Sequence, residues 1–170
     1  MVLKNLRRML GMDRIRRATT GAAPISPELL KWYMAIGVNV LEGYGMTENT
    51  AICSINRVGA NKLGTVGQAV EGVELAIAED GEILTKGLNS FVGYWHKPEK
   101  TAETFTEDGW LRTGDVGNID DEGYLSITGR LKDIIITAGG KNVTPAEIES
   151  RLKFSHYISD AVVIGDRRKY

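Results

Sequence analysis

Residues 43–48 read GYGMTE, and they follow an apolar run, Val38-Asn39-Val40-Leu41. An apolar run that meets a glycine-rich segment is typical of a buried strand that ends in a turn. Gly43 and Gly45 let the backbone pass close to a bulky group, because neither carries a Cβ. The pattern therefore predicts a turn at a strand end that could accept a ligand.

Three side chains of this segment carry chemistry. Tyr44 offers an aromatic face, Thr47 a hydroxyl and Glu48 a carboxylate. The last two are oxygen ligands that suit Mg²⁺, and a flat ring beside them would suit a nucleotide. A loop closed by an ordinary Asx- or Ser/Thr-type turn has the same composition. On these six residues alone, the plain turn is the better interpretation.

Three further clusters change that balance. They read DGWLRTGD at residues 108–115, GRLKD at 129–133 and GGKNVTPAEIE at 139–149. With GYGMTE, in this order and spacing, they resemble the acyl-adenylate-forming (AMP-binding) superfamily of acyl-CoA synthetases, firefly luciferase and peptide-synthetase adenylation domains. The resemblance runs from about residue 18 to the end of the chain. Within the superfamily, these sequence segments are most similar to those of AMP-forming long-chain fatty acid–CoA ligases.

Composition and charge exclude several other classes of protein. The chain has 170 residues, 42% of them apolar, and a net charge of −1, so no global field favours nucleic acid as a partner. Its one cysteine, Cys53, cannot form an internal disulfide, which favours a reducing, cytoplasmic location. No apolar run approaches the length of a membrane span. The basic segment 1–17 could be a transit peptide or a face for phosphate head groups, but a solvated helix over Leu3–Leu10 is the better interpretation.

The expected fold is mixed α/β. A helix is predicted from Pro27 to about Ile36, capped by Ser26. From about residue 64 to 129, short strands alternate with acidic-glycine turns, which predicts an antiparallel, β-barrel-like subdomain. Residues 133–165 read as strand, helix, strand, with a Thr144–Glu147 capping box and a last strand at 161–164. The predicted division is residues 1–129 as the C-terminal part of an AMP-binding domain, 130–132 as a hinge and 133–170 as a truncated C-terminal domain.

The resemblance assigns the adenine, phosphate and metal contacts to the first half of the chain. The matching threonine of the family contacts phosphate and the matching glutamate holds Mg²⁺, so Thr47 and Glu48 take these roles here. Small residues of one loop lie along the adenine and the acyl adenylate, and the aromatic ring lies against the adenine. The residues implied are Gly21, Ala22, Ala23, Gly43, Tyr44 and Gly45.

The second half supplies the ribose contacts and the moving parts. Asp115 matches the aspartate that accepts hydrogen bonds from the two ribose hydroxyls, and Arg130 matches a residue that supports the same ribose. Lys132 takes the place of the hinge residue, and Gly139-Gly140 would line the pantetheine channel of CoA. The plain alternatives are a turn-capping aspartate, a surface arginine, a Lys132–Asp133 ion pair and a hairpin turn. For Glu82, only pairing or turn support is expected.

The implied reaction needs ATP, Mg²⁺ and CoA, and converts a fatty acid to acyl-AMP and then to a thioester. The family also carries a phosphate loop with a lysine and a catalytic lysine near its C-terminus, and neither has a match here. We therefore expect an internal piece of a longer enzyme, a poor catalyst by itself, whose partner is the missing remainder of the parent enzyme. Peripheral membrane contact through the acyl substrate stays open. So do activation of an aryl, medium-chain or amino acid, a non-catalytic nucleotide-binding module and a β-rich interaction domain. The central expectation is that Thr47, Glu48, Asp115 and Arg130 converge on one AMP.

Overall fold

The computed structural model describes residues 2–137, 142–153, 155 and 157–165. The chain divides into two compact units. The first comprises Met1–Glu74, Gly87–Val92 and Asp120–Ser126, and the second Leu75–Lys86, Gly93–Ile119 and Ile127–Tyr170. The predicted division into residues 1–129, 130–132 and 133–170 stays a prediction.

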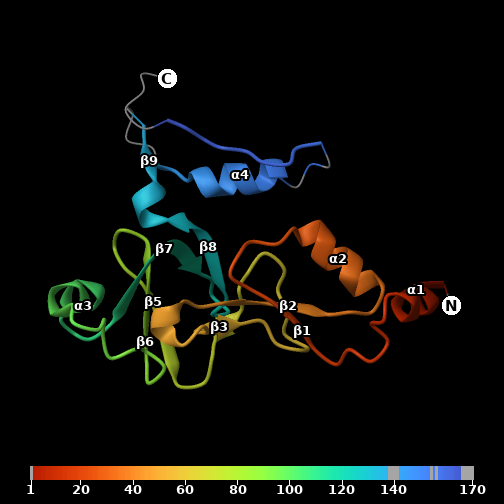
Figure 1. The fold of residues 1–170 in the computed structure, drawn as a ribbon, viewed down its shortest axis with the longest axis horizontal. Helices are drawn as coiled ribbons and strands as arrows, with labels where there is room; N and C mark the ends of the chain where they lie inside the picture. The colour runs from red at the N-terminus through yellow and green to blue at the C-terminus, as the bar shows by residue number, and fades with distance from the viewer. Residues whose placement is uncertain (1, 138–141, 154, 156, 166–170) are drawn as a thin grey trace. The chain divides into compact units, whose positions relative to one another are not determined.

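The first unit is built on a parallel β–α–β crossover (Figure 1). Strands β1 (Ala18–Thr20) and β2 (Val40–Tyr44) pair in parallel, with helix α2 (Pro27–Ala35) between them in sequence. Strands β3 (Ser54–Ile55) and β4 (Gln68–Ala69) extend the sheet antiparallel, in the order β1-β2-β3-β4. Helix α1 (Val2–Met9) precedes the crossover and the short 3₁₀ helix η1 (Thr47–Asn49) follows it.

Local sequence explains the bounds of α2. Ser26 caps its first turn, where the Leu29 N–H donates to Ser26 Oγ at 3.4 Å, and Pro27 takes the first helical position. The helix ends at Ala35, one residue before the predicted end. Its buried Leu30 packs with Ile36, Val38 and Val40, and Leu6, Met12, Ile15 and Tyr33 are among the residues that close this core.

The strand that leads into GYGMTE is longer than predicted. We expected it to end at the glycine-rich segment 43–48, but β2 continues through Gly43 and Tyr44. The reason is a partner in the sheet, because Gly43 pairs with Ile55 and Tyr44 with Ser54 of β3. The turn therefore begins only at Gly45.

The second unit contains most of a four-stranded sheet, which confirms the predicted β-rich part of a mixed α/β fold. Its strands are β5 (Val73–Ile77), β6 (Glu82–Gly87), β7 (Leu111–Ile119) and β8 (Leu125–Arg130), in the order β5-β6-β7-β8. The predicted acidic-glycine turns are present. In each, the glycine N–H donates to a carbonyl three residues earlier: Gly81 to Ala78, Gly109 to Thr106 and Gly123 to Asp120, at 2.9–3.0 Å. Helix α3 (Pro98–Thr104) lies between β6 and β7 in sequence.

After β8, the 3₁₀ helix η2 (Leu131–Asp133) leads to a two-stranded sheet of β9 (Ile135–Ile136) and β10 (Asn142–Val143), and then to α4 (Pro145–Lys153). The Glu147 side chain lies outside the described residues, and so does the predicted capping box. The predicted last strand at residues 161–164 is wrong, since the structure assigns no strand there. Instead of pairing with a strand, the Val163 N–H donates to the Glu149 side chain of α4, at 2.8 Å.

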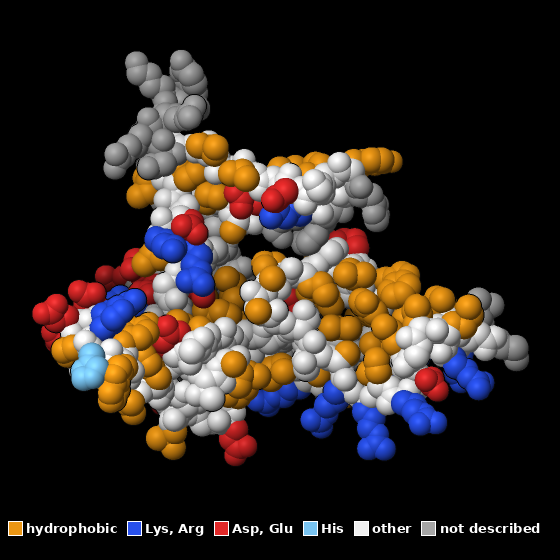
Figure 2. Space-filling model, viewed as in Figure 1, with side chains coloured by type: hydrophobic (Ala, Val, Ile, Leu, Met, Phe, Trp, Pro, Cys, Tyr) orange, Lys and Arg blue, Asp and Glu red, His pale blue; other side chains and the backbone are white. Residues whose placement is uncertain are grey.

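In the first unit, Figure 2 shows hydrophobic side chains over α1 and α2, where Leu3, Met9, Leu10, Leu29, Trp32 and Met34 are exposed. Across the described part of the chain, every helix is too short or too polar to cross a bilayer. Cys53 is fully buried and its thiol lies 3.4 Å from the Tyr44 carbonyl oxygen, so it packs as expected.

Candidate adenylate site

The turn that carries Thr47 and Glu48 is tied down by a buried asparagine. The Met46 N–H donates to Asn49 Oδ1 at 2.8 Å, and the Ala51 N–H returns to the Met46 carbonyl at 2.9 Å. Asn49 is fully buried, whereas Thr47 is exposed and Glu48 half-buried. The buried residue thus fixes the loop from beneath and leaves Thr47 facing solvent.

A second segment of the same unit is hydrogen-bonded to this turn. Asn89 Nδ2 donates to the carbonyls of Asn49 and Ile52, at 2.9 and 2.8 Å. The Phe91 N–H donates to the Glu48 carbonyl at 2.7 Å. Sequence reasoning missed both asparagines. Asn49 carried a usable signal, since an Asx side chain three residues after Met46 can close a turn; Asn89, forty positions away, carried none.

Gly45 is required by the chain's own backbone. A Cβ built on Gly45 would lie 2.3 Å from the Ala51 carbonyl carbon and 2.4 Å from the Ile52 nitrogen. The backbone of Ala51-Ile52 already fills the space that a Cβ on Gly45 would need. The glycine therefore makes room for the chain itself, and our expectation that it makes room for a ligand is wrong. The glycine matters to the site indirectly, by allowing the tight turn that presents Thr47.

The predicted adenine loop does meet the GYGMTE strand. A Cβ on Gly21 would lie 3.0 Å from the Gly43 carbonyl oxygen, so the two glycines bring β1 and β2 into close contact. Ala22 has φ +65°, a left-handed backbone conformation that is costly for a residue with a Cβ. Gly21, Ala22 and Ala23 are all exposed and Tyr44 is half-buried. The structure thus brings Gly21 and Gly43 together in one unit.

A half-buried carboxylate lies next to this contact. Glu42 sits in β2, paired in register with Thr20 of β1. Burial raises the pKa of Glu42 to about 6, because removal from water disfavours the charged form.

Asp115 and Arg130 form an ion pair in the second unit. Arg130 Nε lies 2.8 Å from Asp115 Oδ1, and the side chains are 55% and 10% exposed, respectively. Asp115 lies in the middle of β7, which continues to Ile119, and not at the end of a strand. The pair combines two predicted ribose-binding residues, and the half-exposed arginine leaves one side of it open to solvent.

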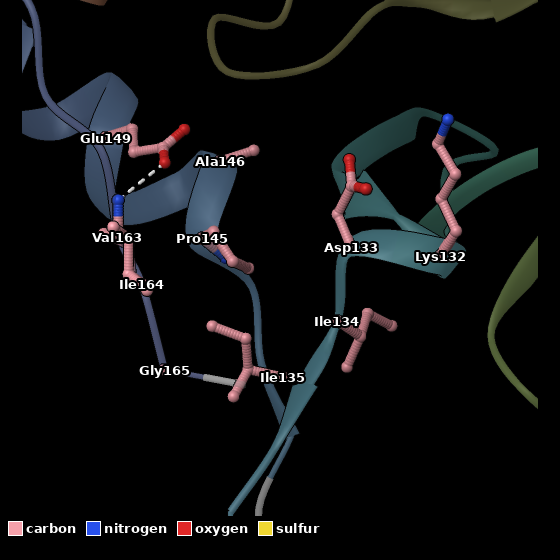
Figure 3. Close-up of a pocket in the computed structure, with 10 residues that line it drawn as sticks. All are labelled: Lys132, Asp133, Ile134, Ile135, Pro145, Ala146, Glu149, Val163, Ile164 and Gly165. Atoms are coloured by element: carbon pink, nitrogen blue, oxygen red, sulfur yellow. Dashed lines mark hydrogen bonds between the residues drawn. The ribbon is translucent and has the colours of Figure 1, made fainter. Parts of the chain in front are cut away.

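Lys132 lies on η2, between β8 and β9, and its side chain is exposed. In Figure 3, the Lys132 and Asp133 side chains both extend upward from this turn. Within the described ranges the two form no ion pair, so the plain alternative for Lys132 is wrong. Of the predicted site residues that the structure describes, only Lys132 borders the hollow of about 450 Å³ in this unit. The hollow is also lined by Asp133, Ile134, Ile135, Pro145, Ala146, Glu149, Val163, Ile164 and Gly165. Gly139 and Gly140 lie outside the described residues.

The candidate metal donors of the GYGMTE turn are the Thr47 hydroxyl and the Glu48 carboxylate. No group of three or more His, Cys, Asp or Glu side chains that could hold a metal occurs within the described ranges. Mg²⁺ is commonly held by one or two carboxylates together with substrate phosphates, and Glu48 beside Thr47 fits that pattern. Thr47 and Glu48 belong to one compact unit and Asp115 and Arg130 to the other. Their convergence on one nucleotide stays a prediction.

Comparisons with known proteins identify the family. A family model described as AMP-binding enzyme matches residues 2–95, and one described as AMP-binding enzyme C-terminal domain matches residues 132–170. The long-chain-fatty-acid–CoA ligase FadD15 of Mycobacterium tuberculosis is 45% identical over 170 residues, which cover 100% of this chain and 28% of that protein. The long-chain-fatty-acid–CoA ligase heimdall of Drosophila melanogaster is 45% identical over 175 residues, covering 99% of this chain and 26% of the relative. The chain thus spans little more than a quarter of the length of these relatives.

Solved structures agree. The o-succinylbenzoate CoA synthetase (MenE) of Bacillus subtilis, in complex with the acyl-adenylate intermediate OSB-AMP, superimposes with a TM-score of 0.84. It is 31% identical, and the match covers 98% of this chain and 37% of that one. A Mycobacterium tuberculosis fatty acyl CoA synthetase matches with a TM-score of 0.68 and 37% identity, over 96% of this chain and 36% of that one. The matches confirm both the mixed α/β fold and the resemblance of the four clusters, and the chain belongs to the AMP-binding enzyme family.

Proposed function

We propose that the chain is part of an AMP-forming long-chain fatty acid–CoA ligase. In the proposed reaction, a fatty carboxylate oxygen attacks the α-phosphorus of ATP, which yields acyl-AMP and releases pyrophosphate. The CoA thiol then attacks the acyl carbon, the thioester forms and AMP leaves. The observation that carries the proposal is the 45% identity to long-chain-fatty-acid–CoA ligases along the whole chain.

Each predicted site residue has a role in this proposal. Gly21, Ala22, Ala23 and the face of Tyr44 bind the adenine, and Thr47 donates its hydroxyl to a phosphate oxygen. Asp115 accepts hydrogen bonds from the ribose hydroxyls, and Arg130 orients that carboxylate. These contacts hold the α-phosphorus in place for attack, and correct placement removes much of an activation barrier. The exposure of Thr47 and the 2.8 Å Asp115–Arg130 contact support the assignment.

Mg²⁺, when held by Glu48 and the phosphates, would neutralise negative charge on the nucleotide. Glu48 fits this role because it carries a carboxylate, is half-buried and directly follows the exposed Thr47 in the chain. Lys132 would act in the second half of the reaction as the point of rotation of the C-terminal domain. A hinge needs only a few residues that absorb a large backbone change. The exposed position of Lys132 on a three-residue 3₁₀ helix, with no ion pair to Asp133, supports that role.

A transplant into a longer relative tests the proposal. In FadD15, the segment that aligns with this chain would be replaced by residues 1–170, and palmitate-dependent AMP release would be measured with ATP, Mg²⁺ and CoA. We expect AMP release above a no-palmitate control, and its loss when Asp115 is changed to Ala in the transplanted segment. A correctly folded chimera without palmitate-dependent AMP release would contradict the proposed function.

The 170-residue chain alone should show little or no fatty-acid-dependent exchange of pyrophosphate into ATP, because neither family lysine has a match in it. Saturable AMP binding by the same chain would separate a nucleotide site from a β-rich interaction domain. Activation of another carboxylic acid is the second candidate. It is favoured by structural matches to an o-succinylbenzoate CoA synthetase and an anthranilate CoA ligase. A cytoplasmic location and peripheral contact with a membrane through the acyl substrate stay predictions.

A further inference from the structure

Asp115 lies in a bulge of β7. Glu82 of β6 pairs with Val116, and Leu84 of β6 pairs with Arg112. On β6, only Ile83 lies between Glu82 and Leu84. On β7, three residues lie between their partners Arg112 and Val116: Thr113, Gly114 and Asp115. Bulges bend a strand and change the direction of a side chain, and they are frequent beside active sites. Gly114 has φ +71°, which suits glycine and turns the strand immediately before Asp115.

Two side chains bond the backbone groups that the bulge removes from the regular ladder. Glu82 Oε1 accepts the Gly114 N–H at 2.8 Å. Thr113 Oγ1 donates to the Ile83 carbonyl at 2.7 Å and accepts the Asp115 N–H at 3.1 Å. The backbone N–H groups of Gly114 and Asp115 are therefore fixed by a carboxylate and a hydroxyl.

The β5–β6 hairpin turn does not depend on the buried Glu82 carboxylate. The β5–β6 turn is closed by Asp80, whose Oδ1 accepts the Glu82 N–H at 3.0 Å. The Glu82 side chain is only 4% exposed, and its second oxygen accepts from Arg112 Nη1 at 2.8 Å. A buried carboxylate is costly unless it is paired and hydrogen-bonded. Here the ion pair between Arg112 and Oε2 compensates the charge of Glu82. Oε1 then accepts the N–H of Gly114, the residue before Asp115.

We propose that Glu82 is a positioning residue for nucleotide binding. By holding Gly114, it fixes the bulge and sets the direction of the Asp115 carboxylate, whose Oδ1 lies 2.8 Å from Arg130 Nε. Glu82 thus acts on ribose through Asp115. The inference rests on the proposed function, because it assumes that Asp115 accepts the ribose hydroxyls. It goes beyond the pairing or turn support that sequence predicted for Glu82.

Two conservative variants separate positioning from a general effect on folding. Glu82→Gln keeps an oxygen that can accept the Gly114 N–H but loses the charge, and the half-exposed Arg112 can then turn to water. Glu82→Asp keeps the charge but is one methylene shorter, so it cannot hold both Gly114 and Arg112. A role of charge alone predicts that the Asp variant is the milder one, and positioning predicts the opposite order.

The measurement is the ratio of the dissociation constants for 2′,3′-dideoxy-AMP and AMP on the 170-residue chain. Both nucleotides bind only folded protein, so a change in the folded fraction cancels in this ratio. We expect the unaltered chain to prefer AMP by roughly tenfold, as for hydrogen bonds to a charged group. Glu82→Gln should keep most of that preference, and Glu82→Asp should lose most of it.

Asp115→Ala separates the failure of this inference from the failure of the proposed function. If the unaltered chain shows no preference for AMP, or Asp115→Ala keeps it, the ribose role of Asp115 is wrong and the inference falls with it. If Asp115→Ala abolishes the preference while Glu82→Asp retains it in full, Asp115 binds ribose but Glu82 does not position it. Loss in Glu82→Gln with retention in Glu82→Asp would also overturn the inference.

Discussion

Replacement of Gly45 by alanine should destabilise the first unit strongly. The added Cβ would lie 2.3 Å from the Ala51 carbonyl carbon and 2.4 Å from both the Ala51 oxygen and the Ile52 nitrogen. Ordinary contacts between carbon atoms are about 3.5–4.0 Å, so the overlap exceeds ~1 Å and involves backbone that cannot rotate away. The chain must shift at Gly45 or at Ala51. Either shift strains the Ala51–Met46 and Cys53–Tyr44 backbone hydrogen bonds, which are 2.9 and 2.8 Å long.

Overpacking of a filled site typically costs about 1–3 kcal/mol, and three backbone atoms at once place Gly45→Ala near ~3 kcal/mol. Because domains are stable by only about 5–15 kcal/mol, this is a large share of the total. Urea unfolding followed by circular dichroism should show a midpoint lowered by roughly 1–2 M, with an unchanged slope. Binding of Mg²⁺–ATP should also weaken, since the same turn carries Thr47 and Glu48.

Gly64→Ala is the matched control in the same unit. A Cβ there meets nothing within 4 Å, but Gly64 has φ +82°, so the change should cost only the about 1–2 kcal/mol of a left-handed backbone. The steric argument requires Gly45→Ala to be clearly the more harmful of the two. Equal losses, or a Gly45→Ala variant within ~0.5 kcal/mol of the unaltered chain, would refute it.

Two further changes test other parts of the first unit. Arg7 donates to the carbonyls of Met12, Gly37 and Ile15 at 2.8, 2.7 and 3.0 Å, so Arg7→Gln should lower the free energy of unfolding by about 2 kcal/mol. The exposed Arg8→Gln should change it by less than ~0.5 kcal/mol, and equal effects in urea titrations would contradict the bracing role of Arg7. Because the pKa of Glu42 is raised from 4.5 to about 6 in the folded chain, the native state binds this proton more tightly than the unfolded state, and its stability should fall as pH rises from about 4.5 to about 6. Glu42→Gln should remove that fall and gain roughly 1 kcal/mol above pH 6, a value reduced for the half-exposed side chain; parallel pH profiles of the two proteins would speak against it.

Elements with local signals were predicted well from the sequence. Ser26 and Pro27 mark the start of α2 because capping and a fixed φ act within one turn. The acidic-glycine turns at Gly81, Gly109 and Gly123 follow from three or four residues each, and all three are present. The four clusters also identified the family, because order and spacing along the chain need no knowledge of contacts.

Features that depend on a distant partner could not be read from local pattern. β2 reaches Tyr44 because β3 pairs with it, and the expected strand at 161–164 does not form in the described chain. Both segments are apolar and rich in β-branched residues, so composition alone did not distinguish the strand that forms from the one that does not. The bulge that contains Asp115 arises from the register of β6 against β7, and the proposed role of Glu82 depends on that register. Sequence therefore singled out Asp115 as a candidate ribose ligand, but it predicted no more than pairing or turn support for Glu82.

The structure also separates two reasons for which a residue can belong to a motif. Gly45 fits the Ala51-Ile52 backbone and Asn49 closes the turn beneath it, so both serve the chain's own packing. Thr47 is exposed on the same turn, and the Asp115–Arg130 pair has a half-exposed side, so these can meet a ligand. Loss of a residue of the first kind should lower stability and binding together, whereas loss of the exposed Thr47 should lower binding alone. That distinction makes stability, measured beside nucleotide affinity, the decisive control for every variant of this site.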